Sequence, residues 1–134
     1  MAKYKLVDGE QVRLALCTID TATVVAAGDL VAIDTGLIIK AVAASAAIAW
    51  CPKGSATGDT TCEVTIGNDF TLKGTLDAVF AVTYKGGEYD IEDTTQLIDL
   101  DASATDVLKI DTSENAGTVG STDEVRVRIN KPIF

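Results

Sequence analysis

Short stretches in which apolar and polar residues alternate recur about every ten residues along this chain. The clearest is 125–130, where Val, Val and Ile alternate with Arg, Arg and Asn. A period of two places successive side chains on opposite faces, which is typical of a half-buried strand. The pattern predicts strands at 11–19, 30–33, 37–42, 48–51, 62–66, 76–84, 89–91, 96–100, 107–110 and 125–130, with 76–84 as a central strand.

Turn sequences separate these stretches. Gly28-Asp29, Asp34-Thr35-Gly36 and the hairpin sequence Lys85-Gly86-Gly87-Glu88 are all typical of tight turns. The alanine-rich segment 43–49 favours a helix by propensity but is too short for its periodicity to decide. We therefore expect one mainly β domain over 1–134, a small β-barrel or β-sandwich with an N-terminal arm at 1–8 and at most one or two short helices.

The size and composition of the chain agree with this fold class. The 134 residues are enough to bury a core without disulfides or metals. Aromatic residues are only 5% of the chain, so the apolar 47% comes mostly from small and β-branched side chains, which suit sheets. The apolar stretch 37–52 contains Lys40 and is too short to cross a bilayer. No apolar run follows Lys3 and Lys5, so neither a secretory leader nor a membrane partner is predicted.

Charge is spread unevenly over the sequence. The net charge is −9, and residues 88–124 contain eleven acidic residues against a single base, Lys109. The remainder has nine acids and ten bases and is nearly neutral. The negative net charge argues against nucleic acid as a partner, because phosphate binding needs clustered Lys and Arg. The uneven distribution of charge predicts one acidic face that stays in solvent, while the nearly neutral remainder approaches a partner.

Residues that could carry chemistry are few. The chain has no histidine, which excludes His-dependent nucleophilic catalysis and most zinc sites. Cys17, Cys51 and Cys62 form no C-x-x-C motif and are predicted to be small buried side chains, although pairing of Cys51 with Cys62 stays open. The glycine-rich loops 53–60 and 117–120 lack the order of a phosphate-binding motif. We predict no enzymatic activity and no cofactor.

Closely spaced carboxylates are the remaining candidates. The alternating acids at 88, 90 and 92 are predicted to share one strand face, and Asp99 and Asp101 do the same. Such a group could act as an acid–base pair or bind calcium. An EF-hand loop starting at Asp99 fails, because Ala104 and Ile110 stand where Gly and Glu are needed. A solvated acidic face is the simpler interpretation, and cation binding by this segment stays open.

Both ends of the chain are candidate contact segments. Residues 131–134 are apolar apart from Lys131, and an exposed Ile-Phe end is unfavourable unless it packs on its own core or on a neighbouring subunit. Residues 1–6 are basic and amphipathic and could reach a partner. The predicted contacts to a capsid or a second subunit are Lys3, Tyr4, Lys5, Leu6, Pro132, Ile133 and Phe134.

Three segments resemble the capsid decoration proteins of tailed phages: 28–38 (GDLVAIDTGLI), the alanine-rich stretch ending in 47–50 (AIAW) and 125–130 (VRVRIN). The resemblance lies in a pattern of β segments and Gly-Asp turns. It implies a small β-rich virion protein, made in the host cytoplasm, that binds the major capsid protein on the outside of the head. It further implies a homo-oligomer, often a trimer, that strengthens the shell, with residues 1–6 as an arm that orders on the capsid.

Two other classes of function are compatible with the same residues. One is a different virion component, such as a tail-tube, head-fibre base or adaptor subunit. The other is a carbohydrate- or calcium-binding β module, which would draw on the carboxylates and the few surface aromatics.

Overall fold

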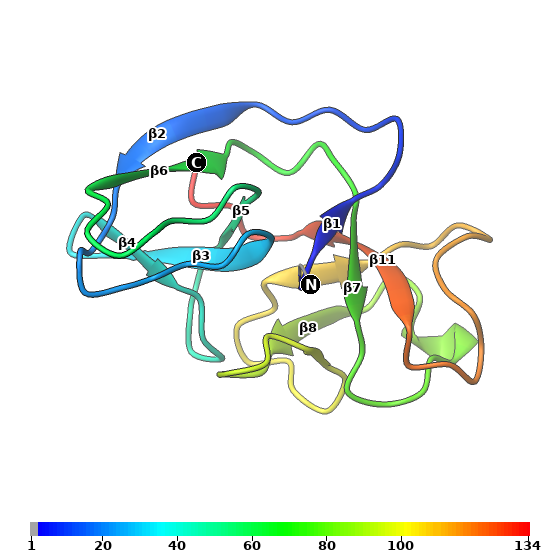
Figure 1. Ribbon diagram of the computed structural model, residues 1–134. Coiled ribbons are helices and arrows are strands. Elements are labelled where there is room, and N and C mark those ends of the chain that lie inside the picture. Colours follow the sequence, from blue (N-terminus) through cyan, green and yellow to red (C-terminus); the bar gives the residue numbers. More distant parts are fainter. Residues whose placement is uncertain (1–2) are drawn as a thin grey trace.

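The computed structural model describes residues 3–134 and confirms a mainly β fold (Figure 1). In these residues the only helical element is the 3-10 helix η1, Val82–Tyr84. The strands are β1 (Lys5–Leu6), β2 (Leu14–Thr18), β3 (Asp29–Asp34), β4 (Leu37–Lys40), β5 (Ala49–Cys51), β6 (Thr61–Thr65), β7 (Leu72–Thr75), β8 (Glu88–Ile91), β9 (Ile98–Asp99), β10 (Leu108–Ile110) and β11 (Glu124–Ile129).

These strands form three antiparallel sheets in a β-sandwich-like arrangement. The largest has the order β1-β7-β11-β10-β8-β9, and the smaller two have the orders β4-β3-β5 and β2-β6. In Figure 1 the two small sheets lie together on one side of the molecule and the six-stranded sheet lies on the other. The predicted strand 125–130 becomes β11, which lies inside the six-stranded sheet between β7 and β10.

The core has two parts. The main core lies between the six-stranded sheet and β3, β4 and β5, and it holds the larger side chains, among them Trp50, Phe70 and Phe80. The second core lies under β2 and β6 and includes Ile38, Val64, Cys51 and Cys62. All three cysteines are free thiols, and burial raises the pKa of each. The expected core of small residues thus also contains four large aromatic residues, since Tyr4 is buried there as well.

Gln96 joins the two parts of the molecule. Its side chain is buried, accepts a hydrogen bond from the Leu30 amide (2.9 Å) and donates to the carbonyls of Leu30 (2.8 Å) and Ala41 (2.9 Å). Its own carbonyl accepts a bond from the Tyr4 hydroxyl (2.7 Å). The backbone at Gln96 is left-handed, with φ of 55°. The predicted strand 96–100 is therefore wrong at its start, because the Gln96 side chain bonds to β3 and to the residue after β4, and strand pairing begins only at Ile98.

The N-terminal arm is not confirmed. Residues 3–8 lie on the body of the protein: β1 pairs with β7, and the Tyr4 side chain is buried in the main core. Lys3 lies 3.6 Å from the buried carboxylate of Asp29. The Tyr4 ring fits because residue 74 is glycine, where any Cβ would overlap the ring. Met1 and Ala2, which the predicted arm included, lie outside the described residues.

The predicted central strand 76–84 is also wrong. Only Leu76 and Phe80 of its apolar residues are buried, while Val79 and Val82 are exposed and η1 ends the segment. The Phe80 amide donates to the Ser121 carbonyl, and the Gly120 amide donates to the Phe80 carbonyl. These bonds fasten the segment to a loop, so its backbone follows that loop and does not form a ladder. No helix among residues 3–134 is long and apolar enough to cross a membrane.

Candidate functional site

Basic side chains gather on the solvent-facing side of the six-stranded sheet. Alternation along β11 buries Val125, Val127 and Ile129 and leaves Glu124, Arg126 and Arg128 outward. We give the name outer sheet face to the part of this surface formed by β1, β7, β11, β10 and the start of β8, whose charged residues are Lys5, Lys73, Lys109, Arg126, Arg128, Glu88 and Glu124. Asp90 and Asp99 continue the same side of the sheet beyond Glu88 and are not part of this face. Five bases against two acids give this face a charge of +3 in a chain of net charge −9.

The register of the strands sets these bases in rows. Lys5 lies opposite Lys73, and Lys73 lies opposite Arg126, so one row crosses three strands that are far apart in the sequence. Arg128 lies opposite Lys109 on the other side of β11, and this pair continues to Glu88 on β8. Like charges directly opposite one another cost stability unless an anion lies between them. The face is therefore suited to bind carboxylates from outside.

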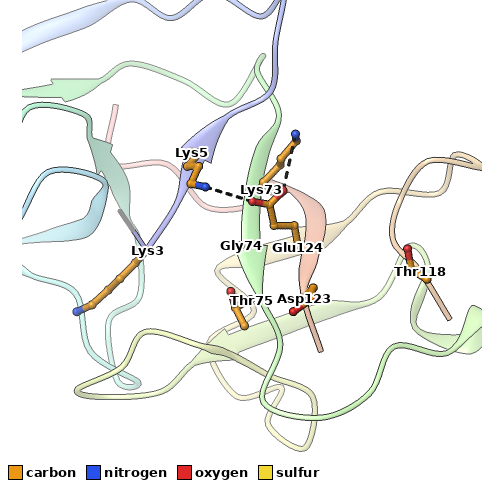
Figure 2. A pocket seen from close by; sticks show the side chains of 8 residues that line it. All are labelled: Lys3, Lys5, Lys73, Gly74, Thr75, Thr118, Asp123 and Glu124. Atoms are coloured by element: carbon orange, nitrogen blue, oxygen red, sulfur yellow. Dashed lines mark hydrogen bonds and ion pairs between the residues drawn. The ribbon is translucent and has the colours of Figure 1, made fainter. Parts of the chain in front are cut away.

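The Glu124 carboxylate already neutralises part of the positive charge on the outer sheet face. Figure 2 shows the groove of about 520 Å³ beside β1, β7 and β11, in which Glu124 lies 3.3 Å from the Lys5 ammonium and 3.8 Å from that of Lys73. Lys3, Thr118 and Asp123 also line the groove. Arg128 lies 3.8 Å from Asp69, which precedes β7. These pairs are exposed and weak, so a partner's carboxylates can replace them at low cost.

The predicted contact residues at the N-terminus divide between surface and core. Lys3 and Lys5 line the groove, Leu6 is partly buried beside it, and the Tyr4 side chain is in the core, where it cannot reach a partner. The sequence analysis missed the bases that lie beside them on β7, β10 and β11. The alternation at 125–130 already put the two arginines on the polar side of a strand, but nothing local indicated which strands would be its neighbours.

The predicted contact residues at the C-terminus lie elsewhere. Pro132 forms a parallel bridge with Ile48, and the Ile133 amide donates to the Ile48 carbonyl (3.1 Å). Ile133 packs against the second core, and the Phe134 carbonyl accepts a bond from the Gly67 amide (3.1 Å). The tail thus docks on its own chain, with the Phe134 side chain half exposed. The structure does not bring it together with Lys3 and Lys5.

Asp90 is not part of a shared acidic face. It is buried while Glu88 is exposed, and its carboxylate accepts bonds from the amides of Ala104 (3.1 Å), Thr105 (2.8 Å) and Asp106 (2.8 Å). Burial alone would favour the neutral acid, but the three amide donors outweigh it and hold the pKa of Asp90 below its ordinary value. Asp90 therefore fixes the loop before β10 and has no free acid–base role.

Asp90→Asn is expected to lower the free energy of unfolding by about 1–3 kcal/mol at pH 7, because the asparagine NH2 group would face backbone donors. A lowered folded pKa gives stability that is present above the unfolded value, near 3.8, and is lost as the pH falls through the folded value. The difference between variant and wild type should therefore shrink below about pH 3.8. Urea titrations from pH 7 to pH 2 measure it. A difference that does not change with pH would contradict the assignment.

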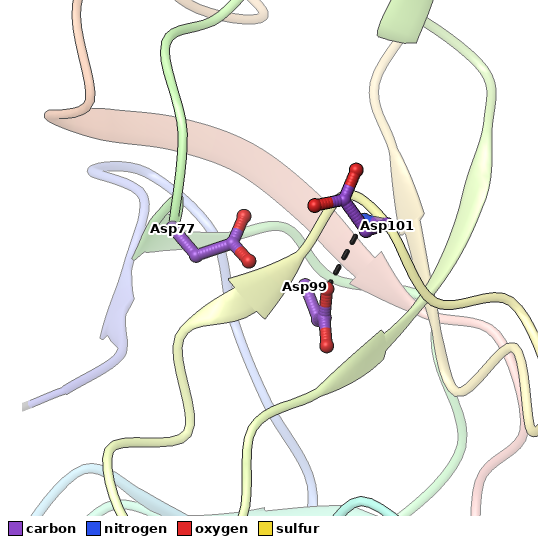
Figure 3. A group of neighbouring side chains, drawn as sticks. All are labelled: Asp77, Asp99 and Asp101. Atoms are coloured by element: carbon purple, nitrogen blue, oxygen red, sulfur yellow. Dashed lines mark hydrogen bonds between the residues drawn. The ribbon is translucent and has the colours of Figure 1, made fainter.

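A second group of carboxylates lies at the β9 edge. Asp77, Asp99 and Asp101 place one oxygen each within 4.8 Å of one another (Figure 3). The sequence pattern indicated Asp99 and Asp101, and the parallel bridge between Leu76 and Ile98 adds Asp77. Burial raises the pKa of Asp77, and the charges of Asp99 and Glu92 raise it further.

The aspartate cluster is chemically suitable for a hard cation, since Ca²⁺ takes 6–8 oxygen ligands. Two of its oxygens are already used, however: Asp99 accepts from the Asp101 amide (3.0 Å) and Asp77 from the Leu100 amide (3.1 Å). These bonds stabilise the turn after β9 without an ion. The cluster by itself is the kind of group that acidic surfaces commonly carry.

Comparisons with known proteins give no information about function, so the outer sheet face is the main structural evidence. No family model matches the chain, and neither a curated protein nor a solved structure does.

Proposed function

We propose that this chain is a structural virion protein that decorates the outer surface of a phage head, binds the major capsid protein and stabilises the shell. It acts by binding and catalyses no reaction. The sequence resemblance to tailed-phage decoration proteins supports this class of function, and it also favours a homo-oligomer, a trimer above all. The structural observation that carries the proposal is the +3 outer sheet face in a protein of net charge −9.

The chemistry of this face suits a broad protein surface. A six-stranded sheet offers a wide area, and Lys and Arg side chains recognise carboxylates by charge-assisted hydrogen bonds. Charge complementarity of this kind speeds association and selects against wrong partners more than it adds affinity. On a lattice, many weak contacts of this kind sum to strong retention through avidity. The proposed counterpart is therefore an acidic patch repeated on the capsid exterior.

The rest of the protein surface is acidic and is suited to face solvent instead of the capsid. Once the outer sheet face is subtracted, the rest of the chain carries −12, which keeps it hydrated and discourages contacts other than those with bases. In the proposed orientation, the aspartate cluster and the acidic loops point to solvent or along the shell. A different position in the virion, at the tail or neck, is the alternative, and imaging of labelled particles separates the two.

The test uses purified expanded heads that lack this protein. We expect the wild-type chain to co-sediment with the heads at a copy number that matches the capsid lattice and to raise their rupture temperature. The double variant Lys109→Glu/Arg126→Glu should bind at least tenfold more weakly, because it turns two of the five bases into acids. Binding should also weaken as salt is raised.

The matched control is Lys85→Glu/Lys131→Glu, which makes the same change in net charge at solvent-accessible positions outside the outer sheet face and outside β2. It should bind heads like the wild type. Equal loss in both variants would show that only net charge matters and would remove the outer sheet face from the proposal. Failure of the wild-type chain to bind heads, or its absence from virions, would end the proposal itself. If the chain does not bind heads and calcium raises its melting temperature, the result favours the alternative of a calcium-binding module.

A further inference from the structure

We propose that strand β2 is a pairing edge for a second copy of this chain: two β2 strands join antiparallel and merge the two β2-β6 sheets into one four-stranded sheet. This contact lies away from the outer sheet face, and it holds whether or not the chain binds capsids. It is distinct from the threefold contact that a trimer would need, because a twofold contact joins copies in pairs.

The backbone of β2 has one paired side and one open side. Ala15 lies opposite Val64 and Cys17 opposite Cys62. The Ile66 amide donates to the Arg13 carbonyl, and the Ile19 amide donates to the Thr60 carbonyl. Hydrogen-bonded pairs alternate along an antiparallel ladder, so the odd-numbered residues of β2 bond to β6. The N–H and C=O groups of Leu14 and Leu16 therefore point away from β6, and in the described part of the chain no strand pairs with them.

The side chains on this edge are also unusual for solvent. Leu14 is 36% exposed and Leu16 is 69% exposed, the largest exposed fraction of the large hydrophobic residues described. Native proteins protect open edges with lysine, proline, bulges or covering loops. β2 has none of these between residues 14 and 18. The segment that pairs with such an edge must be an extended strand, so that it bonds to the free backbone groups, and it must carry apolar side chains at every second position, so that they pack on the leucines.

Among residues 3–134, the other sheet edges are short or lie against another segment, and the edges of β5 and β6 face each other. The Asp20 amide bonds to Ile38 at β4, and the Asp77 amide bonds to Ile98 at β9. β5 is flanked by β6 and the C-terminal tail, and β1 is only two residues long. A head-to-tail assembly through strand addition needs two different open edges, whereas a twofold assembly needs only one. A second copy of the chain offers the same β2 edge without any rearrangement. Because both copies then use the same edge, the two are related by a twofold axis.

The sequence of β2 is self-complementary in this arrangement. With Ala15 at the twofold axis, Leu14 of each copy lies opposite Leu16 of the other, and about four main-chain hydrogen bonds form. The four leucines then cover one another on the outer side of the merged sheet. This register also keeps the second strand away from the end of β2, where Asp20 bonds to β4.

Charge around β2 permits two copies to approach. The charged residues that flank β2 in the sequence are Arg13 and Asp20, which have opposite signs, and the neighbouring Glu63 carboxylate lies 3.0 Å from the Lys53 ammonium. The acidic segment 88–124 contributes no strand to this sheet. The contact involves few residues, so we expect a dissociation constant between about 10 µM and 1 mM in solution. Copies held side by side on a surface would pair much more completely through effective concentration.

The experiment is sedimentation velocity of the full chain between about 10 µM and 1 mM, beside amide hydrogen exchange at the same two concentrations. We expect the sedimenting species to shift from 14.0 kDa toward twice that mass. The Leu14 and Leu16 amides should gain protection at high concentration, while those of Ala15 and Cys17, already bonded to β6, should be protected at both. Leu16→Lys should weaken association at least tenfold.

Val119→Lys is the matched control, since Val119 is 61% exposed in a loop and receives the same added charge. It should associate like the wild type. Leu14→Lys is a second edge variant, used if Leu16→Lys alters the melting temperature. A chain that stays monomeric at 1 mM overturns the proposal. So does an oligomer that Leu16→Lys leaves intact, or one in which the Leu14 and Leu16 amides gain no protection; a trimer of that kind would mean that another surface holds the copies together.

Discussion

Gln96→Ala is expected to lower the free energy of unfolding by about 3–5 kcal/mol, the largest effect of any single polar substitution in this protein. The change removes the partner of three backbone groups, the N–H and C=O of Leu30 and the C=O of Ala41. Leu30 and Ala41 are fully buried, so water cannot replace the lost bonds without opening the main core. Chemical denaturation followed by far-UV circular dichroism measures the loss.

The control for Gln96 is Gln11→Ala, an exposed glutamine whose removal should change stability by less than about 0.5 kcal/mol. Alanine and glutamine are equally strained at the left-handed backbone of residue 96, so the difference reports on the side chain alone. A loss below about 1 kcal/mol would mean that the bonds at Leu30 and Ala41 do not join the two parts of the molecule as described.

Tyr4→Ala is expected to cost about 3–5 kcal/mol, because it removes a buried aromatic ring and leaves a cavity against Gly74. Tyr4→Phe keeps the ring and loses only the bond from its hydroxyl to the Gln96 carbonyl, for which about 0.5–1.5 kcal/mol is expected. Thermal and urea unfolding of both variants separate the contribution of packing from that of the hydrogen bond.

Lys5→Ala is the neighbouring control. Lys5 is exposed and its ion pair with Glu124 is weak, so the loss should stay below about 1 kcal/mol. An N-terminal arm that orders only on a partner would make Tyr4→Ala as neutral as Lys5→Ala. That result would restore the arm and contradict the packing of Tyr4 in the main core.

Alternation of apolar and polar residues predicts which side of a segment is buried but not which segment its backbone bonds to, and this explains the errors in the predicted strands. Alternation was decisive at β11, where period two alone placed both arginines outward. It failed at 76–84, whose apolar composition is that of a strand but whose backbone bonds go to the loop around Ser121. It missed β7, since Gly74 interrupts the pattern there. That glycine is itself informative, because a glycine inside a strand often marks the close approach of another group, here the Tyr4 ring.

The candidate site was predictable only in part. Lys3 and Lys5 were singled out from their own charge and position, but their companions Lys73 and Arg126 are about seventy and one hundred and twenty residues away and join them through strand register. The edge character of β2 was equally hidden. Its sequence predicts a strand with two faces, and only the topology shows that no strand of residues 3–134 pairs with the open backbone side of Leu14 and Leu16.

The sequence by itself determined the mainly β class, most strand positions, the outward direction of Arg126 and Arg128, and the uneven charge. These properties follow from local periodicity and composition, which act over a few residues. The tertiary structure alone decided which strands are neighbours, that Tyr4 is buried, that Asp90 holds a loop, and that Gln96 serves a strand 66 residues away. Such contacts depend on how distant segments meet, and short-range patterning fixes which side of a strand faces the core but not what lies beside it.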